Sequence, residues 1–246
     1  MKRGSLLFIG LGIASLLGAC GAPGSEELGP DGERQIETGA ICPGATVVRG
    51  IDVSYWQGTI NWTSVKGAGK QFAMIRHSDG SYLDPQRFTN WNNAKAAGLT
   101  VGFYQFFRAS QDPYAQADLI LAALNTVNGN GRPNLPPVID IETYDGQSAA
   151  TVISKVNKWL AYVQSKTGRQ PVLYTSPGCW SGLGYPTPSP LPYLWDAHWT
   201  SGCPTVPSPW GRLRFWQYSA TGAVSGISGD VDLDLYNGSL AEMQGL

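Results

Sequence analysis

The sequence has few charged residues, few histidines and few cysteines, and each shortage argues against a class of protein. Only 14% of its 246 residues are charged, and 17 basic side chains against 18 acidic ones give a formal net charge of −1. Since no basic patch or basic tail is present, nothing indicates binding to nucleic acid. Two histidines and the lack of any Cys-x-x-Cys spacing argue against a zinc site. We therefore expect no metal and no other cofactor.

The chain also lacks an apolar run long enough for a permanent membrane span, although a shorter run stands near its start. Lys2 and Arg3 precede an apolar segment over residues 6–17, which is shorter than the roughly 20 residues that a spanning helix needs. The Leu-Gly-Ala-Cys sequence that follows resembles the processing site of a bacterial lipoprotein and ends at Cys20. We predict a lipoprotein signal peptide over residues 1–20 and lipidation of Cys20. An ordinary secretory signal with a chance cysteine is the alternative.

The residues after this signal divide into a tether and one domain. Residues 21–45 are rich in glycine, proline and glutamate, which predicts a flexible tether with a root-mean-square reach of about 25–30 Å. Residues 46–246 are long enough for one domain with a full core. We expect a monomer that is exported and anchored through Cys20 to the inner or outer membrane of the cell envelope.

Export would place the chain in an oxidising compartment, where disulfides can form. Beyond Cys20 the sequence contains Cys42, Cys179 and Cys203. We predict a disulfide between Cys179 and Cys203, which would staple two loops late in the chain. The state of Cys42 is left open.

Strand and helix patterns alternate along the domain. Strands are predicted over residues 47–54, 72–76, 100–107, 138–142 and 172–175, and helices over residues 85–97, 113–127 and 148–166. Gly98 and Gly168 stand where a helix C-terminus is expected. Strands over residues 194–199, 213–218 and 231–235 follow, with weak helical signals between them. The alternation predicts an α/β fold, an irregular TIM-like (β/α) barrel with a helix-poor C-terminal third.

The strand over residues 138–142, Val-Ile-Asp-Ile-Glu, carries two acids at alternate positions. Asp140 and Glu142 therefore point to the same face, and a rise of about 3.3 Å per residue places their Cα atoms roughly 6–7 Å apart. Two carboxylates near this spacing can flank one glycosidic bond. An acidic pair in an apolar strand is also costly to bury and needs a compensating reason. A strand end whose acids cap a loop or pair with arginine is the alternative.

Polar and aromatic residues fall at or near the C-terminal ends of several predicted strands, where the active site of such a barrel lies. One shared cleft could therefore contain Asp52, Arg76, Tyr104, Glu142, Tyr174 and Trp216.

An ordered set of short segments spans the chain from about residue 48 to its C-terminus. The set comprises Gly-Ile-Asp-Val-Ser-Tyr-Trp-Gln-Gly from residue 50, Phe-Ala-Met-Ile-Arg from 72, Gly-Phe-Tyr-Gln-Phe from 102, Val-Ile-Asp-Ile-Glu from 138, Pro-Val-Leu-Tyr-Thr from 171, Leu-Trp-Asp-Ala-His-Trp from 194, Trp-Gln-Tyr from 216 and Val-Asp-Leu-Asp from 231. It resembles the family 25 glycoside hydrolases, lysozymes of the Chalaropsis type that cut bacterial peptidoglycan. Each segment alone is weak evidence for this family, but the ordered set is highly specific for it.

The chain departs from this family at three positions. Gln105 stands where the family often has histidine, Asp196 where it has a hydrophobic residue, and His77 where a small residue is common. We expect these changes to tune the cleft or its optimum pH, since they leave the four acidic positions of the family intact.

The resemblance implies an N-acetylmuramidase that cleaves the β-1,4 bond between N-acetylmuramic acid and N-acetylglucosamine in peptidoglycan strands. Glu142 would be the general acid, Asp140 a nucleophile or a stabiliser of cationic charge, and Asp52 and Asp232 the two further acids of the cleft. Without the resemblance, Asp52 could bond to backbone at the barrel bottom and Asp232 could belong to a turn. A covalent intermediate and attack by the substrate's acetamido group both stay open.

Aromatic residues near the strand ends are candidates for stacking on sugar rings, although each could instead fill the barrel core. They are Tyr55, Tyr104, Tyr174, Trp195, Trp199 and Trp216. Arg76 could orient a carboxylate of the cleft or meet the lactyl or peptide groups of the substrate. His198 is expected to be a structural hydrogen-bonding residue.

Two other functions are weighed against this one. A catalytically silent, glycan-binding lipoprotein on the same barrel would need no buried proton donor, so the Asp140–Glu142 pair argues against it. A chitinase-like enzyme carries a longer run of spaced aspartates before its glutamate. Pro136, Pro137 and Val138 occupy that stretch here.

Overall fold

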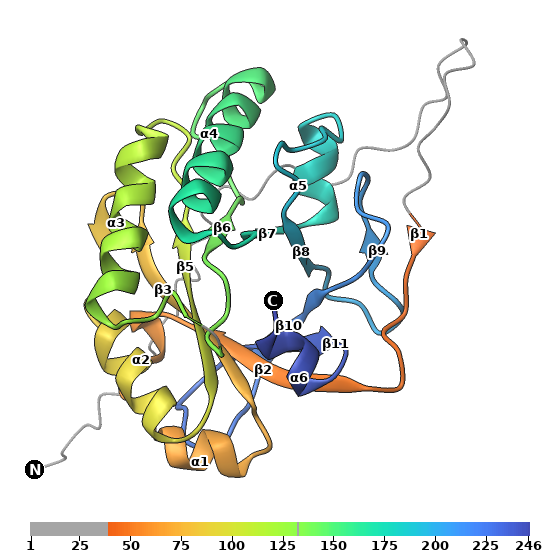
Figure 1. Ribbon diagram of the computed structural model, residues 1–246. Helices are drawn as coiled ribbons and strands as arrows, with labels where there is room; N and C mark the ends of the chain where they lie inside the picture. Colours follow the sequence, from red (N-terminus) through yellow and green to blue (C-terminus); the bar gives the residue numbers. More distant parts are fainter. Residues whose placement is uncertain (1–38, 132) are drawn as a thin grey trace, which may run out of the picture.

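Eight strands close into a barrel in the computed structural model, which describes residues 39–131 and 133–246 (Figure 1). The predicted signal peptide, Cys20 and most of the predicted tether lie outside these residues. Around the barrel the strands follow the order β2, β11, β10, β8, β7, β6, β5 and β3, and β3 pairs back with β2. Their bounds are β2 Val47–Val53, β3 Phe72–Asp79, β5 Thr100–Phe106, β6 Val138–Asp140, β7 Val172–Thr175, β8 Tyr193–Ala197, β10 Phe215–Gly222 and β11 Val231–Asn237.

One barrel strand runs against the others. The pairs from β2 through β3, β5, β6, β7 and β8 to β10 are all parallel, whereas β11 is antiparallel to both of its neighbours, β10 and β2. Strand β4 (Tyr82–Leu83) forms a short hairpin with the end of β3. Strands β1 (Gly39–Ala40) and β9 (Thr205–Val206) form a separate two-stranded sheet.

Helices cover mainly one side of the barrel, on the left of Figure 1. The long ones are α2 (Arg87–Ala96), α3 (Pro113–Thr126) and α4 (Ala149–Thr167), and the short ones are η1 (Tyr55–Gln57), α1 (Trp62–Gly67), α5 (Pro177–Gly182) and α6 (Leu240–Gln244). In the described chain no helix lies between β8 and β11, so the predicted irregular barrel with a helix-poor C-terminal third is confirmed. None of these helices combines the length and apolarity that a membrane crossing needs.

The predicted long helices begin and end where their terminal signals stand. The side chain of Asp112 accepts a hydrogen bond from the Ala115 amide at the start of α3, and Pro113 occupies the first turn. Ser148 caps α4 in the same way. That helix ends at Gly168, whose φ of 66° is left-handed and favours glycine. Local sequence therefore fixes these three segments to within about two residues.

The strands separate two hydrophobic clusters because their side chains alternate between the faces. The inner cluster fills the barrel with rings such as those of Phe72 and Phe215, whose centroids are 5.8 Å apart. Gly50 leaves room for Phe72, since a Cβ at position 50 would lie 2.4 Å from that ring. Met243 of α6 belongs to the inner cluster, and the side chain of Gln244 donates to Thr100 at the start of β5. Helix α6 therefore closes the barrel at the N-terminal ends of its parallel strands.

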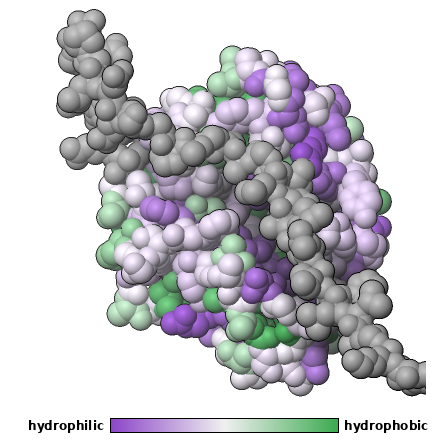
Figure 2. Space-filling model, turned by 180° about the vertical axis from the view of Figure 1, so that it is seen from behind, coloured by the Kyte–Doolittle hydropathy of each residue, from purple (hydrophilic) through white to green (hydrophobic). Residues whose placement is uncertain are grey.

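The outer cluster lies between the barrel and its helices. It includes Ile51 and Ile75 from the strands and Trp91 and Trp159 from α2 and α4. Seen from behind, the surface mixes hydrophilic and hydrophobic residues (Figure 2), as is usual for a folded domain.

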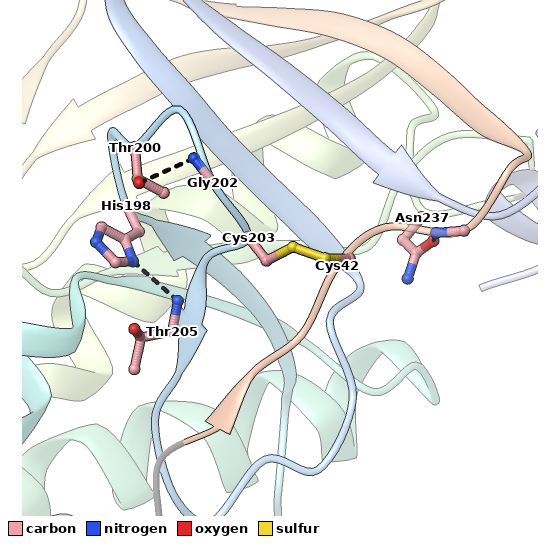
Figure 3. Close-up of a disulfide and its surroundings, with 8 residues drawn as sticks. Cys42, His198, Thr200, Gly202, Cys203, Thr205 and Asn237 are labelled. Atoms are coloured by element: carbon pink, nitrogen blue, oxygen red, sulfur yellow. Dashed lines mark hydrogen bonds between the residues drawn. A yellow bond between two sulfur atoms is a disulfide. The ribbon is translucent and has the colours of Figure 1, made fainter.

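Cys203 forms its disulfide with Cys42, so the predicted bond between Cys179 and Cys203 is wrong (Figure 3). The two bonded residues are 161 positions apart in the sequence. They meet because Gly39–Ala40 pairs with Thr205–Val206 and the Ile41 amide donates to the Pro204 carbonyl at 2.9 Å. Residues 39–44, the last part of the predicted tether, are thus fastened to the barrel.

Candidate active site

A cavity of about 380 Å³ opens at the C-terminal ends of the parallel strands. Its wall contains side chains from every strand of the barrel and from η1. Each parallel strand contributes a residue near its last position, as expected when inward-facing side chains alternate along strands of similar length. The cavity therefore lies at the end of the barrel opposite α6.

Four acidic residues line this cavity: Asp52, Asp140, Glu142 and Asp232. Asp52 lies near the end of β2, directly opposite Asp232 in the β2–β11 register. Asp232 stands near the start of β11 rather than its end, because β11 is antiparallel and enters the barrel at the cavity side. The structure thus brings together all four acids singled out in the sequence.

Strand β6 ends at Asp140, two residues short of the predicted strand, so Glu142 lies in the segment that follows, yet both side chains line the cavity. Burial raises the pKa of both carboxyl groups, and the charge of Glu142 raises the pKa of Asp140 further. Asp140 hydrogen-bonds to Glu142, while Arg108 and Arg76 oppose the rise in the pKa of Glu142. Two adjacent buried carboxyl groups cannot both ionise readily, so the pair retains a proton to a higher pH than either would alone.

Asp52 and Asp232 form a second acidic group across the cavity. Burial and the charges of Asp232 and Asp234 hold the pKa of Asp52 well above its usual range. Burial and the charge of Glu142 raise the pKa of Asp232 to about 7. Asp234 itself lies below the cavity wall, where its Oδ1 accepts a hydrogen bond from the indole of Trp195 at 2.9 Å.

Gln217 joins three residues of the site, and the sequence analysis missed it. Its Nε2 donates to Oδ2 of Asp52 at 2.7 Å, and its Oε1 accepts from the Tyr174 hydroxyl and the Trp199 indole, both at 2.9 Å. Gln217 therefore fixes one oxygen of Asp52. The signal for it was strand alternation, since on β10 only one of the adjacent residues Trp216 and Gln217 can face inward.

Arg76 lines the cavity but is already paired with an acid. Its Nε lies 3.1 Å from Oδ2 of Asp84, which is fully buried and also accepts from the Tyr55 amide at 2.9 Å. The guanidinium lies 5.1 Å from the centre of the Tyr55 ring. Asp84 therefore holds Arg76 in place, and Tyr55 stands behind Arg76 instead of lining the cavity.

The predicted aromatic residues divide between the cavity and the core. The cavity wall contains Tyr104, Tyr174 and Trp195. The rings of Tyr174 and Trp195 meet edge to face, with their centroids 4.7 Å apart. Trp216 is not brought there, because it faces the outer cluster and its indole donates to the His198 carbonyl at 2.7 Å.

Two tryptophans at the mouth of the cavity are strongly exposed. Trp56, on η1, is 69% exposed, and Trp199 is 63% exposed. Trp56 was not singled out in the sequence, although the Ser-x-x-Gln spacing from residue 54 is a signal for the start of the short helix that projects it. Ser54 and Gln57 form the capping box of that helix.

The three residues at which the chain departs from the family lie away from the cavity wall. Gln105 faces α4, where its Oε1 accepts from the Trp159 indole at 2.8 Å. His77 contacts Phe88 and Phe103. Asp196 is fully buried and faces away from the barrel interior, and burial raises its pKa to about 8. Their effect on the cleft or its optimum pH therefore stays a prediction, and it would have to act through neighbouring residues.

The arrangement suits acid-assisted cleavage of a polar substrate. A buried carboxyl pair that retains a proton can protonate a leaving oxygen, and further carboxylates nearby can stabilise a developing positive charge. The two exposed tryptophans at the mouth offer flat apolar surface to a sugar, and the buried rings of Tyr104, Tyr174 and Trp195 line the cavity below them.

Comparisons with known proteins agree with this chemistry. The family model described as glycosyl hydrolases family 25 matches residues 51–227. Lysozyme M1 of Streptomyces globisporus is 41% identical over 218 residues, which cover 81% of this chain and 71% of the relative. The N,O-diacetylmuramidase of Chalaropsis sp is 29% identical over 203 residues, which cover 75% of this chain and 96% of the relative.

Solved structures show the same fold. A bacterial lysozyme from Streptomyces coelicolor superposes with a TM-score of 0.74 and 38% sequence identity, covering 82% of this chain and 98% of the other. A muramidase from Trichobolus zukalii gives a TM-score of 0.70 at 27% identity, covering 81% of this chain and 98% of the other.

Proposed function

The chain belongs to glycosyl hydrolase family 25, and from this premise we propose that it is a peptidoglycan hydrolase. The bond that it cleaves is the β-1,4 bond between N-acetylmuramic acid and N-acetylglucosamine, which makes it a lysozyme of the N-acetylmuramidase type. The observation that carries the proposal is the convergence of four carboxyl groups on one cavity. A barrel that only bound glycans would gain nothing from burying four carboxyl groups on one cavity wall.

In this proposal Glu142 is the general acid. Burial raises its pKa, so the group retains a proton that it can deliver to the leaving oxygen of the glycosidic bond. Asp140 lines the same cavity and supplies either the nucleophile or the negative charge that stabilises the oxocarbenium-like transition state. If the acetamido group of muramic acid attacks instead, Asp140 takes the stabilising role.

Asp52 and Asp232 complete the negative lining opposite this pair. Gln217 fixes one oxygen of Asp52, so that carboxyl group is held in one orientation before substrate arrives. Tyr104, Tyr174, Trp195 and Arg76 line the same cavity, and we assign them to contacts with the sugar rings and their substituents.

The test is an analysis of the products released from purified peptidoglycan. Products are reduced with borohydride, and their new reducing ends are identified by mass spectrometry. Reduced muramic acid ends are expected. Reduced glucosamine ends would contradict the assignment of the bond. Retained binding without any release would favour the catalytically silent, glycan-binding alternative.

We further propose that the protein is an exported lipoprotein, with a signal peptide over residues 1–20 and a lipid on Cys20, and that it acts as a monomer. The charged start, the short apolar run and the Leu-Gly-Ala-Cys ending support this proposal. Cells that express the protein should incorporate labelled fatty acid into it, and the Cys20→Ala variant should lose the label. Equal labelling of both proteins would contradict lipidation at this residue.

A further inference from the structure

Residues 198–206, called the 198–206 loop below, run from the end of β8 through β9. This loop is attached at both of its ends. At its start the His198 amide donates to the Gln217 carbonyl at 3.2 Å, and the Trp216 indole donates to the His198 carbonyl at 2.7 Å. Across the loop the Thr205 amide donates to Nδ1 of His198 at 2.9 Å (Figure 3). The far side of the loop is bonded to residues 39–44 by the β1–β9 pairing and by the Cys42–Cys203 disulfide.

Trp199 is the residue that this loop presents to the cavity. Its Nε1 donates to Oε1 of Gln217 at 2.9 Å, and Gln217 in turn donates to Asp52 at 2.7 Å. The polar edge of the indole is thus satisfied, while 63% of the side chain stays exposed at the cavity mouth. An exposed tryptophan with a fixed edge and a bare face is suited to a flat apolar partner.

The disulfide is the strongest of the bonds that hold the outer side of the loop. Strand β9 has only two residues and pairs only with the two residues of β1, and a ladder of that length is marginal by itself. Removing the disulfide would leave residues 39–44 and the 198–206 loop held together by a few backbone bonds. The loop, and the indole on it, would then occupy a wider range of positions.

We propose that Trp199 is a sugar-binding residue of the cleft, and that the Cys42–Cys203 disulfide is the element that positions it beside Gln217 and Asp52. This inference rests on the proposed function and deepens it, because it assigns affinity for the glycan strand to a loop outside the barrel strands. Trp199 contacts the substrate, whereas the disulfide acts through Trp199 and is a positioning element.

The first test compares the Trp199→Ala and Trp199→Phe variants with the natural protein on soluble, uncrosslinked peptidoglycan strands. Trp199→Ala should raise KM about tenfold, the effect of losing one aromatic contact of ordinary strength, with a much smaller change in kcat. Trp199→Phe should recover part of the loss, because it keeps an aromatic face. Tyr114→Ala is the matched control, since Tyr114 is an exposed aromatic residue on α3 outside the cavity wall. Its KM should not change.

The second test is a double-mutant cycle between Trp199 and the disulfide. Joint replacement of Cys42 and Cys203 by serine should raise KM severalfold in the natural background. In the Trp199→Ala background the same replacement should leave KM unchanged, because the residue that the disulfide positions is gone. Kinetics are measured at 20 °C, and circular dichroism establishes that each variant is folded.

The outcomes separate this inference from the proposed function. If the natural protein releases muramic acid ends but Trp199→Ala leaves KM unchanged, the inference fails and the function stands. If the disulfide variant raises KM equally in both backgrounds, the positioning role fails. Should the natural protein release nothing, the function fails, and the inference is then decided by binding of the same strands, which Trp199→Ala must weaken.

Discussion

Among the described residues of the site, Arg76 and Arg108 each pair with an acid outside the cavity wall. Arg76 is paired with the buried Asp84, and Arg108 is paired with Asp79 and Asp145. Both lower the pKa of Glu142, but burial outweighs them, and the pKa of each cavity acid rises. The surroundings that make these acids expensive to ionise are the same that let one of them hold a proton for catalysis.

Replacement of Glu142 by glutamine should remove the proton donor for the leaving oxygen of the glycosidic bond. We expect kcat on peptidoglycan to fall by about 10²- to 10⁴-fold, the usual contribution of a general acid. Glycan binding and the thermal unfolding midpoint should stay close to those of the natural protein, because glutamine keeps the size and polarity of the side chain. A kcat within tenfold of the natural value would show that the proton donor lies elsewhere.

The ionisation of Asp232 should destabilise the fold as the pH rises. Its pKa is about 7 in the folded chain, above the value of about 3.9 for an aspartate in water, so the folded state binds the extra proton between these values. Asp232→Asn should therefore be no more stable than the natural protein below pH 4 and increasingly more stable up to about pH 7.

Urea unfolding at a series of pH values measures this difference. Asp230→Asn is the control, since Asp230 is an exposed acid two residues earlier and lies outside the cavity wall. A stability gain for Asp232→Asn that is independent of pH would contradict the ionisation of Asp232 as its cause.

Among the elements, those with a complete local pattern were predictable from sequence. The three long helices carry an apolar face together with a cap or a terminal glycine, and β6 carries a β-branched apolar pair before Asp140. Strands β1, β4 and β9 have two residues each, too few for any periodicity. They form only because the closed barrel brings their partners together, and the Cys42–Cys203 disulfide depends on them.

Strand β10 shows a different limit. The sequence identifies the strand, but Trp216 and Gln217 are adjacent, and period-two alternation alone does not say which of them faces inward. The aromatic residue was the natural choice for a sugar-binding site. The register of β10 against β8 and β11 instead turns Gln217 to the cavity and Trp216 to the outer cluster.

Substitution of Gly50 by alanine should disturb the interior of the barrel. A Cβ on β2 would overlap the Phe72 ring, which is fixed by its contact with Phe215. The expected loss is about 1–3 kcal/mol in the free energy of unfolding, as for other overpacked cores, measured by urea unfolding. Gly67→Ala is the control: a Cβ there meets nothing within 4 Å, and its effect should be under about 1 kcal/mol. Equal effects of the two changes would contradict this packing argument.

For the whole molecule, the Cys42–Cys203 disulfide closes a loop that contains most of the domain. Replacing both cysteines by serine should lower the free energy of unfolding by about 2–5 kcal/mol, because the unfolded chain regains the freedom that a long loop had lost. Substitution is preferable to a reducing agent, since it removes this one bond alone. Urea unfolding with the Tyr114→Ala variant as reference measures the loss, and a change below about 1 kcal/mol would contradict it.

The antiparallel strand β11 also determines when activity can appear during biosynthesis. The barrel closes only when β11 inserts between β10 and β2, and that step places Asp232 opposite Asp52. A nascent chain that has not yet emerged through residue 237 therefore has neither a closed barrel nor a complete set of acids. We therefore expect a chain truncated before β11 to have no activity on peptidoglycan.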